Sequence, residues 1–210
     1  MKTILLGGLG MKMKHLQKYS SSPSIPLTYN SLYTSSVKYG HHRYASQLKQ
    51  VLLQNEKSIL HVFSAASWFC VDKVLHDETC KNRIAGVIME SNPYYFDEKQ
   101  FVKEIKRQNK ILQPISSTFL ENGLKLYLDV NGATPAWRYN YLEKMNNIDL
   151  PTMVIASKED QIIPYNYSLE FYNSLSTNKE LFLSDTGQYC RIIRDNPEYI
   201  DKIEIFKKNL

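Results

Sequence analysis

Three polar residues, Ser64, Asp160 and Gln188, each follow a short apolar run that is typical of a buried strand. Ser64 ends SILHVFS, Asp160 ends PTMVIASKED, and Gln188 comes shortly after ELFLSDTG. A serine hydroxyl at a strand end suits nucleophilic attack, and a carboxylate suits the orientation of a general base. The third position should hold that base, an imidazole that titrates near neutrality, whereas a glutamine carboxamide cannot take the serine proton. The three residues therefore predict a serine-hydrolase site that has lost its base.

The elements that must position these residues alternate along the chain between strand and helix. The predicted strands are rich in apolar and β-branched residues and cover 3–8, 26–33, 58–64, 84–93, 151–160 and 180–185. The predicted helices repeat apolar residues at helical spacing and cover 41–57, 68–78, 165–175 and 197–210. This alternation predicts an α/β fold, in which one mainly parallel sheet is covered by helices on both faces. Functional side chains of such a sheet gather at the carboxyl ends of its strands.

Residues 94–150 break the alternation. They contain helical stretches but no convincing strand, and they lie between two predicted strands of the sheet. We predict a small helical cap here, inserted into a single domain that covers residues 1–210 and positioned over the carboxyl ends of the strands.

The composition is that of an ordinary globular protein, with 43% hydrophobic and 22% charged residues and a net charge of +5. The basic residues are scattered apart from KEIKRQNK at 103–110. We interpret this run as a solvated helix face, with a membrane-surface or nucleic-acid patch as the alternatives. Three cysteines without metal spacing favour a reducing compartment, and the opening MKTILLGGLG has too short an apolar segment for a signal peptide. We therefore expect a cytoplasmic protein with no cofactor, no metal and no membrane-spanning helix.

Several stretches resemble one known family. LLGGLGMKMKHLQKYS is similar to the opening strand, glycine turn and helix of the domain-of-unknown-function-829 proteins, and HVFSAAS resembles that family's H-x-F-S-N-G-G turn. GVIMESNP resembles its strand ending in D-S-x-P, and DTGQYCRIIRDNPEY its closing segment. This family is the transmembrane protein 53 (PaxU-like) group of the α/β-hydrolase superfamily. The resemblance implies an α/β-hydrolase fold, an oxyanion hole formed by the backbone N–H groups of Leu9 and Ala65, and a histidine where this chain has Gln188.

Each feature also has a purely structural interpretation. Ser64 could be a helix N-cap, Asp160 could cap the turn before IIP, and His61 on a buried strand is most simply a core histidine whose hydrogen bonds are satisfied.

Two functions follow from the sequence. The first is a pseudo-hydrolase that binds a small apolar ester or ligand, or a protein partner; the second is an active serine esterase that acts through Ser64. We expect no nucleic-acid partner, and the sequence leaves open the oligomeric state and peripheral association with a membrane.

Overall fold

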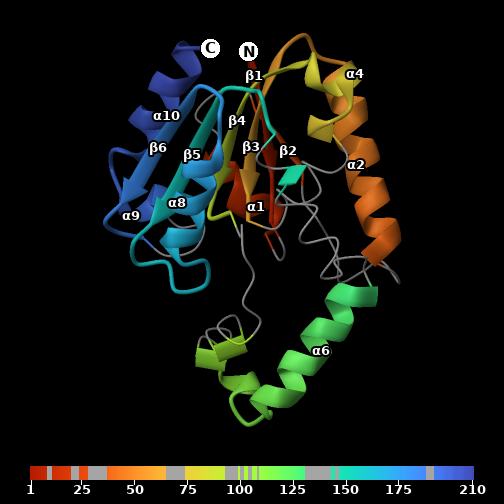
Figure 1. The fold of residues 1–210 in the computed structure, drawn as a ribbon, viewed down its shortest axis with the longest axis vertical. Helices are drawn as coiled ribbons and strands as arrows, with labels where there is room; N and C mark the ends of the chain where they lie inside the picture. The colour runs from red at the N-terminus through yellow and green to blue at the C-terminus, as the bar shows by residue number, and fades with distance from the viewer. Residues whose placement is uncertain are drawn as a thin grey trace.

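Six parallel strands form a single sheet in the order β2-β1-β3-β4-β5-β6 (Figure 1). The computed structural model describes residues 1–8, 11–19, 24–27, 37–64, 74–92, 99, 102–103, 106–107, 109–130, 143–144, 147–187 and 192–210. The strands are β1 (Lys2–Leu6), β2 (Ser24–Leu27), β3 (Ser58–Phe63), β4 (Ile84–Glu90), β5 (Thr152–Ser157) and β6 (Lys179–Ser184). The predicted parallel α/β sheet is confirmed.

The burial of each strand follows from its place in the sheet. All six residues of β3 and of β5 are buried, as expected for inner strands that helices cover on both faces. The edge strand β2 is only half-buried and contains Pro26, whose missing N–H is tolerated at an edge. The second strand lies two residues earlier than the predicted start at 26, and residues 28–36 are outside the described part of the chain.

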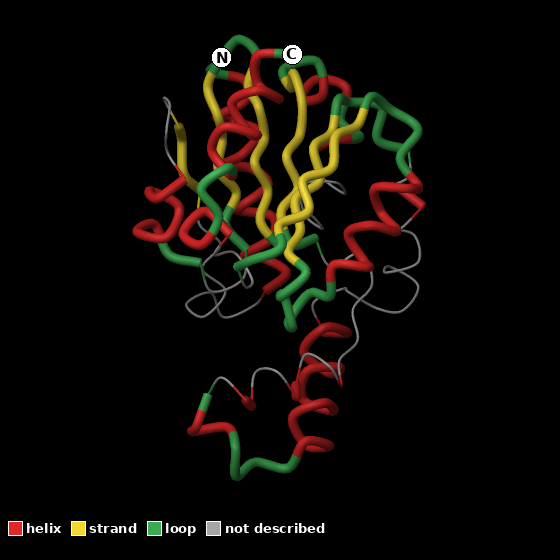
Figure 2. The backbone as a smooth tube through the Cα atoms, turned by 90° about the vertical axis from the view of Figure 1, so that its left-hand side faces the viewer, coloured by secondary structure: helices red, strands yellow, loops and turns green. Residues whose placement is uncertain are grey.

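Helices pack against both faces of the sheet (Figure 2). They are α1 (Met13–Leu16), the 3-10 helix η1 (Gln17–Tyr19), α2 (Val37–Leu53), α4 (Glu78–Lys81), α8 (Tyr165–Ser174), α9 (Ile192–Asp195) and α10 (Tyr199–Lys208). One apolar cluster joins the sheet to α2, α4 and α8 through residues such as Leu48, Cys80 and Phe171. The other joins the opposite face to α1, η1, α9 and α10 through Leu16 and Phe206.

Two predicted helices differ from the structure. Helix α2 begins at Val37, four residues before the expected start, and ends at Leu53. The helix expected over 68–78 is interrupted at Asp77, whose side chain instead caps α4 by accepting hydrogen bonds from the N–H groups of Thr79 and Cys80. Residues 68–73 of that prediction lie outside the described chain.

Between β4 and β5 the described residues contain helices and turns. They include the 3-10 helix η3 (Lys110–Leu112) and α6 (Ser117–Val130), with no strand among the described positions of this segment. Both ribbon views place α6 beyond the edge of the sheet at which the parallel strands end (Figures 1 and 2). The cap boundaries of 94 and 150 stay a prediction. None of the helices in the described parts of the chain has the length and hydropathy needed to cross a bilayer.

Candidate active site

Ser64 lies on a strained turn directly after β3. Its backbone φ of 53° falls in the left-handed region, where residues other than glycine are uncommon. The residue is only 4% exposed, and its N–H donates a 2.9 Å hydrogen bond to the carbonyl oxygen of Glu90 at the end of β4. Strain of this kind costs on the order of 1–3 kcal/mol and persists where the surrounding structure enforces it, which is common at functional sites. This backbone geometry differs from that of a simple N-cap, which has an extended conformation.

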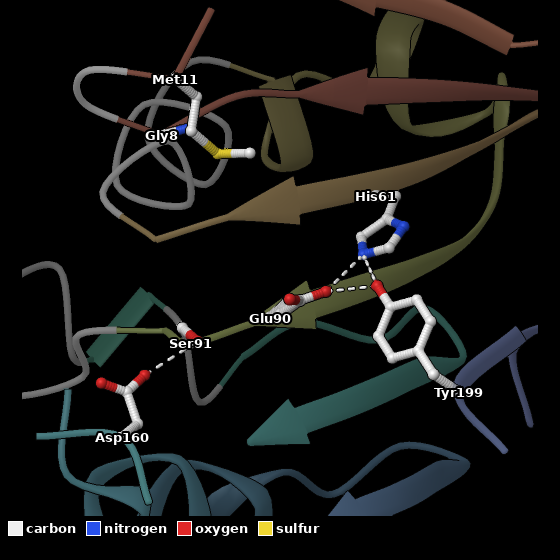
Figure 3. A network of polar contacts seen from close by, with 7 residues as sticks. All are labelled: Gly8, Met11, His61, Glu90, Ser91, Asp160 and Tyr199. Atoms are coloured by element: carbon white, nitrogen blue, oxygen red, sulfur yellow. Dashed lines mark hydrogen bonds and ion pairs between the residues drawn. The ribbon is translucent and has the colours of Figure 1, made fainter. Parts of the chain in front are cut away.

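Gly8 brings the loop after β1 against this turn. A Cβ at Gly8 would lie 2.7 Å from the carbonyl oxygen of Phe63 and 2.8 Å from the Cβ of Ser64, so that only glycine fits here. The loop is held by Met11, whose N–H donates to the Gly8 carbonyl at 3.1 Å and whose sulfur accepts from the Gly8 N–H at 3.4 Å (Figure 3). The backbone at Gly8 is therefore in close contact with the serine turn.

Asp160 is a buried carboxylate with both oxygens hydrogen-bonded. Its Oδ1 accepts from the N–H groups of Ile162 and Ile163 at 2.9 Å each, so the expected turn cap is present. Its Oδ2 accepts from the Ser91 hydroxyl at 3.1 Å (Figure 3). Burial raises the pKa of Asp160 to about 6, because desolvation outweighs these three hydrogen bonds, and the charge of Glu90 adds to the rise. A carboxyl that titrates near neutrality can exchange a proton at physiological pH.

Ser91 is a residue of this site that the sequence analysis did not single out. It directly follows β4, is 1% exposed and has a φ of 49°. Ser64 and Ser91 are the two residues other than glycine with positive φ in the described chain. They end neighbouring strands, because Phe63 pairs with Glu90 in the β3–β4 register. Its place at a strand end was hidden in the sequence, because the predicted strand covered 84–93, whereas β4 ends at Glu90.

The third predicted site residue, Gln188, follows Gly187, which is held in place by a hydrogen bond. The Gly187 N–H donates to the carboxylate of Glu159 at 3.1 Å, which ties this loop to the residue before Asp160. Gly187 has a φ of 96°, and a Cβ there would lie 2.9 Å from the Cα of Ile192. Three predicted site residues, Leu9, Ala65 and Gln188, lie outside the described residues. The structure therefore joins Asp160 to Ser91 and places Ser64 at the adjacent strand end, while the roles given to all five residues stay predictions.

Three histidine side chains that the structure describes are bonded to groups outside this site. His15 Nδ1 accepts from the Lys12 N–H at 3.2 Å, and His76 Nε2 lies 3.3 Å from the carbonyl oxygen of Lys144. His61 is 2% exposed, and its Nε2 lies 3.2 Å from Glu90 Oε2, as expected for a core histidine with a hydrogen-bond partner.

Glu90 is the centre of a buried polar network on the α10 side of the sheet (Figure 3). The Tyr199 hydroxyl donates to Glu90 Oε2 and also lies 3.4 Å from His61 Nε2. Burial lowers the pKa of His61 despite the nearby carboxylate, so we treat the ring as neutral and its Nε2–H as the donor to Glu90. The other carboxylate oxygen, Oε1, is buried without a hydrogen-bond partner in the described structure. This network supports β4, whose last carbonyl holds Ser64.

No metal centre is evident within the described ranges, which contain no cluster of three or more His, Cys, Asp or Glu side chains able to hold an ion. The site as described is a serine at a strained strand end, next to a serine–carboxylate pair.

Comparison with known proteins identifies the fold. A lipase-esterase related protein from Clostridium acetobutylicum is similar over 98% of this chain and 94% of its own, with a TM-score of 0.66 and 18% identity. The esterase Pf2001 of Pyrococcus furiosus matches 99% of this chain and 82% of its own, with a TM-score of 0.66 and 15% identity. A bromoperoxidase from Bacillus anthracis matches 99% of this chain and 91% of its own, with a TM-score of 0.62 and 13% identity.

These likenesses and the parallel six-stranded sheet show that the chain has the α/β-hydrolase fold. At such low identity they show the fold alone. A scan against protein-family models and a search of curated proteins each gave no match.

Proposed function

We propose that the chain is a pseudo-hydrolase that binds a small apolar carboxylic ester, or a ligand of similar shape, around Ser64. The observation that carries the proposal is the strained turn at Ser64, retained although the three described histidine side chains are bonded elsewhere. Strain held at one serine points to a site that still meets a ligand. The esterases among the structural neighbours support the choice of an ester.

The missing step is proton removal from Ser64. In a working triad an imidazole takes the serine proton as the hydroxyl attacks, and then gives it to the leaving alcohol. Gln188 occupies the sequence position where that imidazole is expected, and a carboxamide can neither take the serine proton nor give a proton to the leaving alcohol. Binding and a proposed oxyanion hole at the amides of Leu9 and Ala65 remain, and these alone give about a thousand-fold acceleration over water. Residual hydrolysis should therefore be slow.

Ester turnover tests this proposal directly. With a short-chain p-nitrophenyl ester, the unmodified protein should be slow and poorly labelled by a fluorophosphonate probe. The variant Gln188→His should hydrolyse the ester at least about tenfold faster, since general-base catalysis contributes on the order of 10²–10⁴. Adding Ser64→Ala to that variant should remove the gain. Rapid turnover by the unmodified protein that Ser64→Ala abolishes would contradict the pseudo-hydrolase assignment.

A second candidate, an active serine esterase with an unusual base, is favoured by the Ser91–Asp160 hydrogen bond. In this mechanism Ser64 passes its proton to the Ser91 oxygen as it attacks the ester carbonyl, and the Ser91 proton moves to Asp160 Oδ2. Asp160 returns a proton through Ser91 to the leaving alkoxide, and water then hydrolyses the acyl-serine by the same route. With the Asp160 pKa at about 6, this activity should rise as the pH increases through 6.

Ser91→Ala separates the two candidates. A relay through Ser91 loses turnover in this variant, while an ester bound without chemistry at Ser91 keeps its affinity. Membership of the domain-of-unknown-function-829 group is part of the same proposal and rests on the sequence resemblance.

A further inference from the structure

The most exposed large apolar side chains of the described structure lie together in one part of the chain. Ile111 is 80% exposed, Phe119 71% and Leu126 66%. All three lie between Lys110 and Val130, in η3 and α6. Leu53 on α2 and Ile205 on α10 are each 51% exposed and stand apart from this group. Single exposed apolar residues are ordinary, but three large ones in one short segment indicate a surface that binds another molecule or a membrane.

The position of α6 leaves this apolar surface open. Phe119 and Leu126 are seven residues apart, two helical turns, so they lie on the same face of α6. Gly123 lies between them on this face, and a Cβ there would meet no atom within 4 Å. No residue from 109 to 126 is buried. The helix stands beyond the end of the sheet (Figure 1), and although its Leu124 packs against the core, Phe119 and Leu126 stay exposed.

A basic stretch of the chain includes and precedes this surface, and it lies between the acidic residues Glu98 and Asp129. Residues 99–126 contain six cations against two carboxylates, Glu104 and Glu121, for a net charge of +4. The cations are Lys99, Lys103, Lys106, Arg107, Lys110 and Lys125. Two of them, Lys110 and Lys125, are exposed and directly precede Ile111 and Leu126.

We propose that residues 99–126, here named the docking segment, bind the surface of an anionic phospholipid membrane. Apolar side chains interleaved with lysines match the boundary between acyl chains and anionic headgroups. A second copy of this chain suits the segment less well, because two segments of charge +4 would repel each other. Lys106 supports the start of α6, since its Nζ donates to the Ile115 carbonyl at 2.5 Å and to the Ser117 hydroxyl at 3.2 Å.

This inference goes beyond the proposed function, because binding to a membrane surface needs no chemistry at Ser64. It would place the carboxyl ends of the strands toward the lipid, where apolar esters are concentrated.

Vesicle co-sedimentation provides the test. The unmodified protein should bind vesicles of phosphatidylcholine mixed with phosphatidylserine, bind phosphatidylcholine alone more weakly, and lose affinity at high salt. The double variant Phe119→Ser/Leu126→Ser should bind the anionic vesicles at least about tenfold more weakly. The double variant Lys110→Glu/Lys125→Glu should lose the preference for phosphatidylserine.

Leu53→Ser/Ile205→Ser is the matched control, because it removes two exposed apolar side chains from other helices. This control should bind the anionic vesicles as strongly as the unmodified protein does. The variant Ser64→Ala should also bind them as strongly, which would show that vesicle binding is independent of the proposed site at Ser64. Circular dichroism would check that each variant is folded. Equal binding by the Phe119/Leu126 variant and its control would overturn the proposal, as would no binding by the unmodified protein. A dimer in solution that the Phe119/Leu126 variant converts to monomer would instead assign the surface to a second copy.

Discussion

Replacing Asp160 with asparagine should stabilise the protein at neutral pH. Burial raises the pKa of Asp160 from its ordinary 3.8 to about 6, so the folded protein holds this proton over a range in which the unfolded chain has released it. Stability should therefore fall as the pH rises from about 4 to 6, and the full cost is present at pH 7. One pKa unit is worth about 1.4 kcal/mol, so the ionised carboxylate costs about 3 kcal/mol.

The asparagine side chain fits the same hydrogen bonds. Its Oδ1 can accept from the Ile162 and Ile163 amides, and its Nδ2 can donate to the Ser91 hydroxyl in place of the bond seen at Oδ2. Because the amides lose a charged acceptor, we expect a net gain of about 1–3 kcal/mol in the free energy of unfolding at pH 7. At pH 4 the variant and the unmodified protein should be nearly equal.

Urea unfolding followed by circular dichroism at pH 4, 5, 6 and 7 measures this difference. Asp149→Asn is the control, since Asp149 is exposed, pairs with Lys81 and has a lowered pKa. It should give only a small change, and no gain at neutral pH. If Asp160→Asn instead lowers stability by 1 kcal/mol or more at pH 7, Asp160 acts mainly as a turn cap. A confirmed gain would mark Asp160 as a residue retained for function at a cost in stability.

Three further outcomes follow from the described contacts. Gly8→Ala should lower the free energy of unfolding by about 1–3 kcal/mol, because its Cβ would press on rigid backbone, and denaturant unfolding would measure this; an unchanged midpoint would contradict the close approach. Tyr199→Phe should cost about 2–3 kcal/mol by removing a donor from buried Glu90, whereas Tyr165→Phe on the surface should cost little in the same assay. Burial lowers the pKa of His61, so its ring takes up a proton more readily in the unfolded chain than in the folded protein below pH 6.5, and the contribution of His61 to stability should fall on acidification there, opposite in sign to that of Asp160. His61→Gln should lessen that fall in a pH series of thermal unfolding, and an identical pH dependence would contradict it.

Apolar runs in the sequence were sufficient to predict the inner strands of the sheet. They were not sufficient to predict the bounds of the edge strand β2 or the contacts between the ends of neighbouring strands. SILHVF and TMVIAS are continuous apolar runs, and β3 and β5 match them closely. The start of α2 was missed because Gly40 lowers the helix propensity of its first turn.

The candidate site divides in the same way. Ser64 and Asp160 were found because each follows a buried strand. Ser91 was missed because its partner Asp160 is 69 residues away, across the insertion, and no local spacing reports such a pair. The requirement for glycine at position 8 likewise depends on Phe63 and Ser64, which are distant in sequence.

The buried carboxylate of Glu90 also bears on when the chain can fold during its synthesis. Tyr199, which donates to this carboxylate, is added by the ribosome 109 residues after it. Until α10 emerges and docks, β4 would have to bury the Glu90 carboxylate without the Tyr199 donor, which is unfavourable. An early sheet of β1, β3 and β4 therefore keeps Glu90 hydrated and leaves the face that α10 covers exposed to water. The core on that face can therefore close only after translation has passed α10, and a nascent chain stalled before Tyr199 should expose an apolar surface that chaperones recognise.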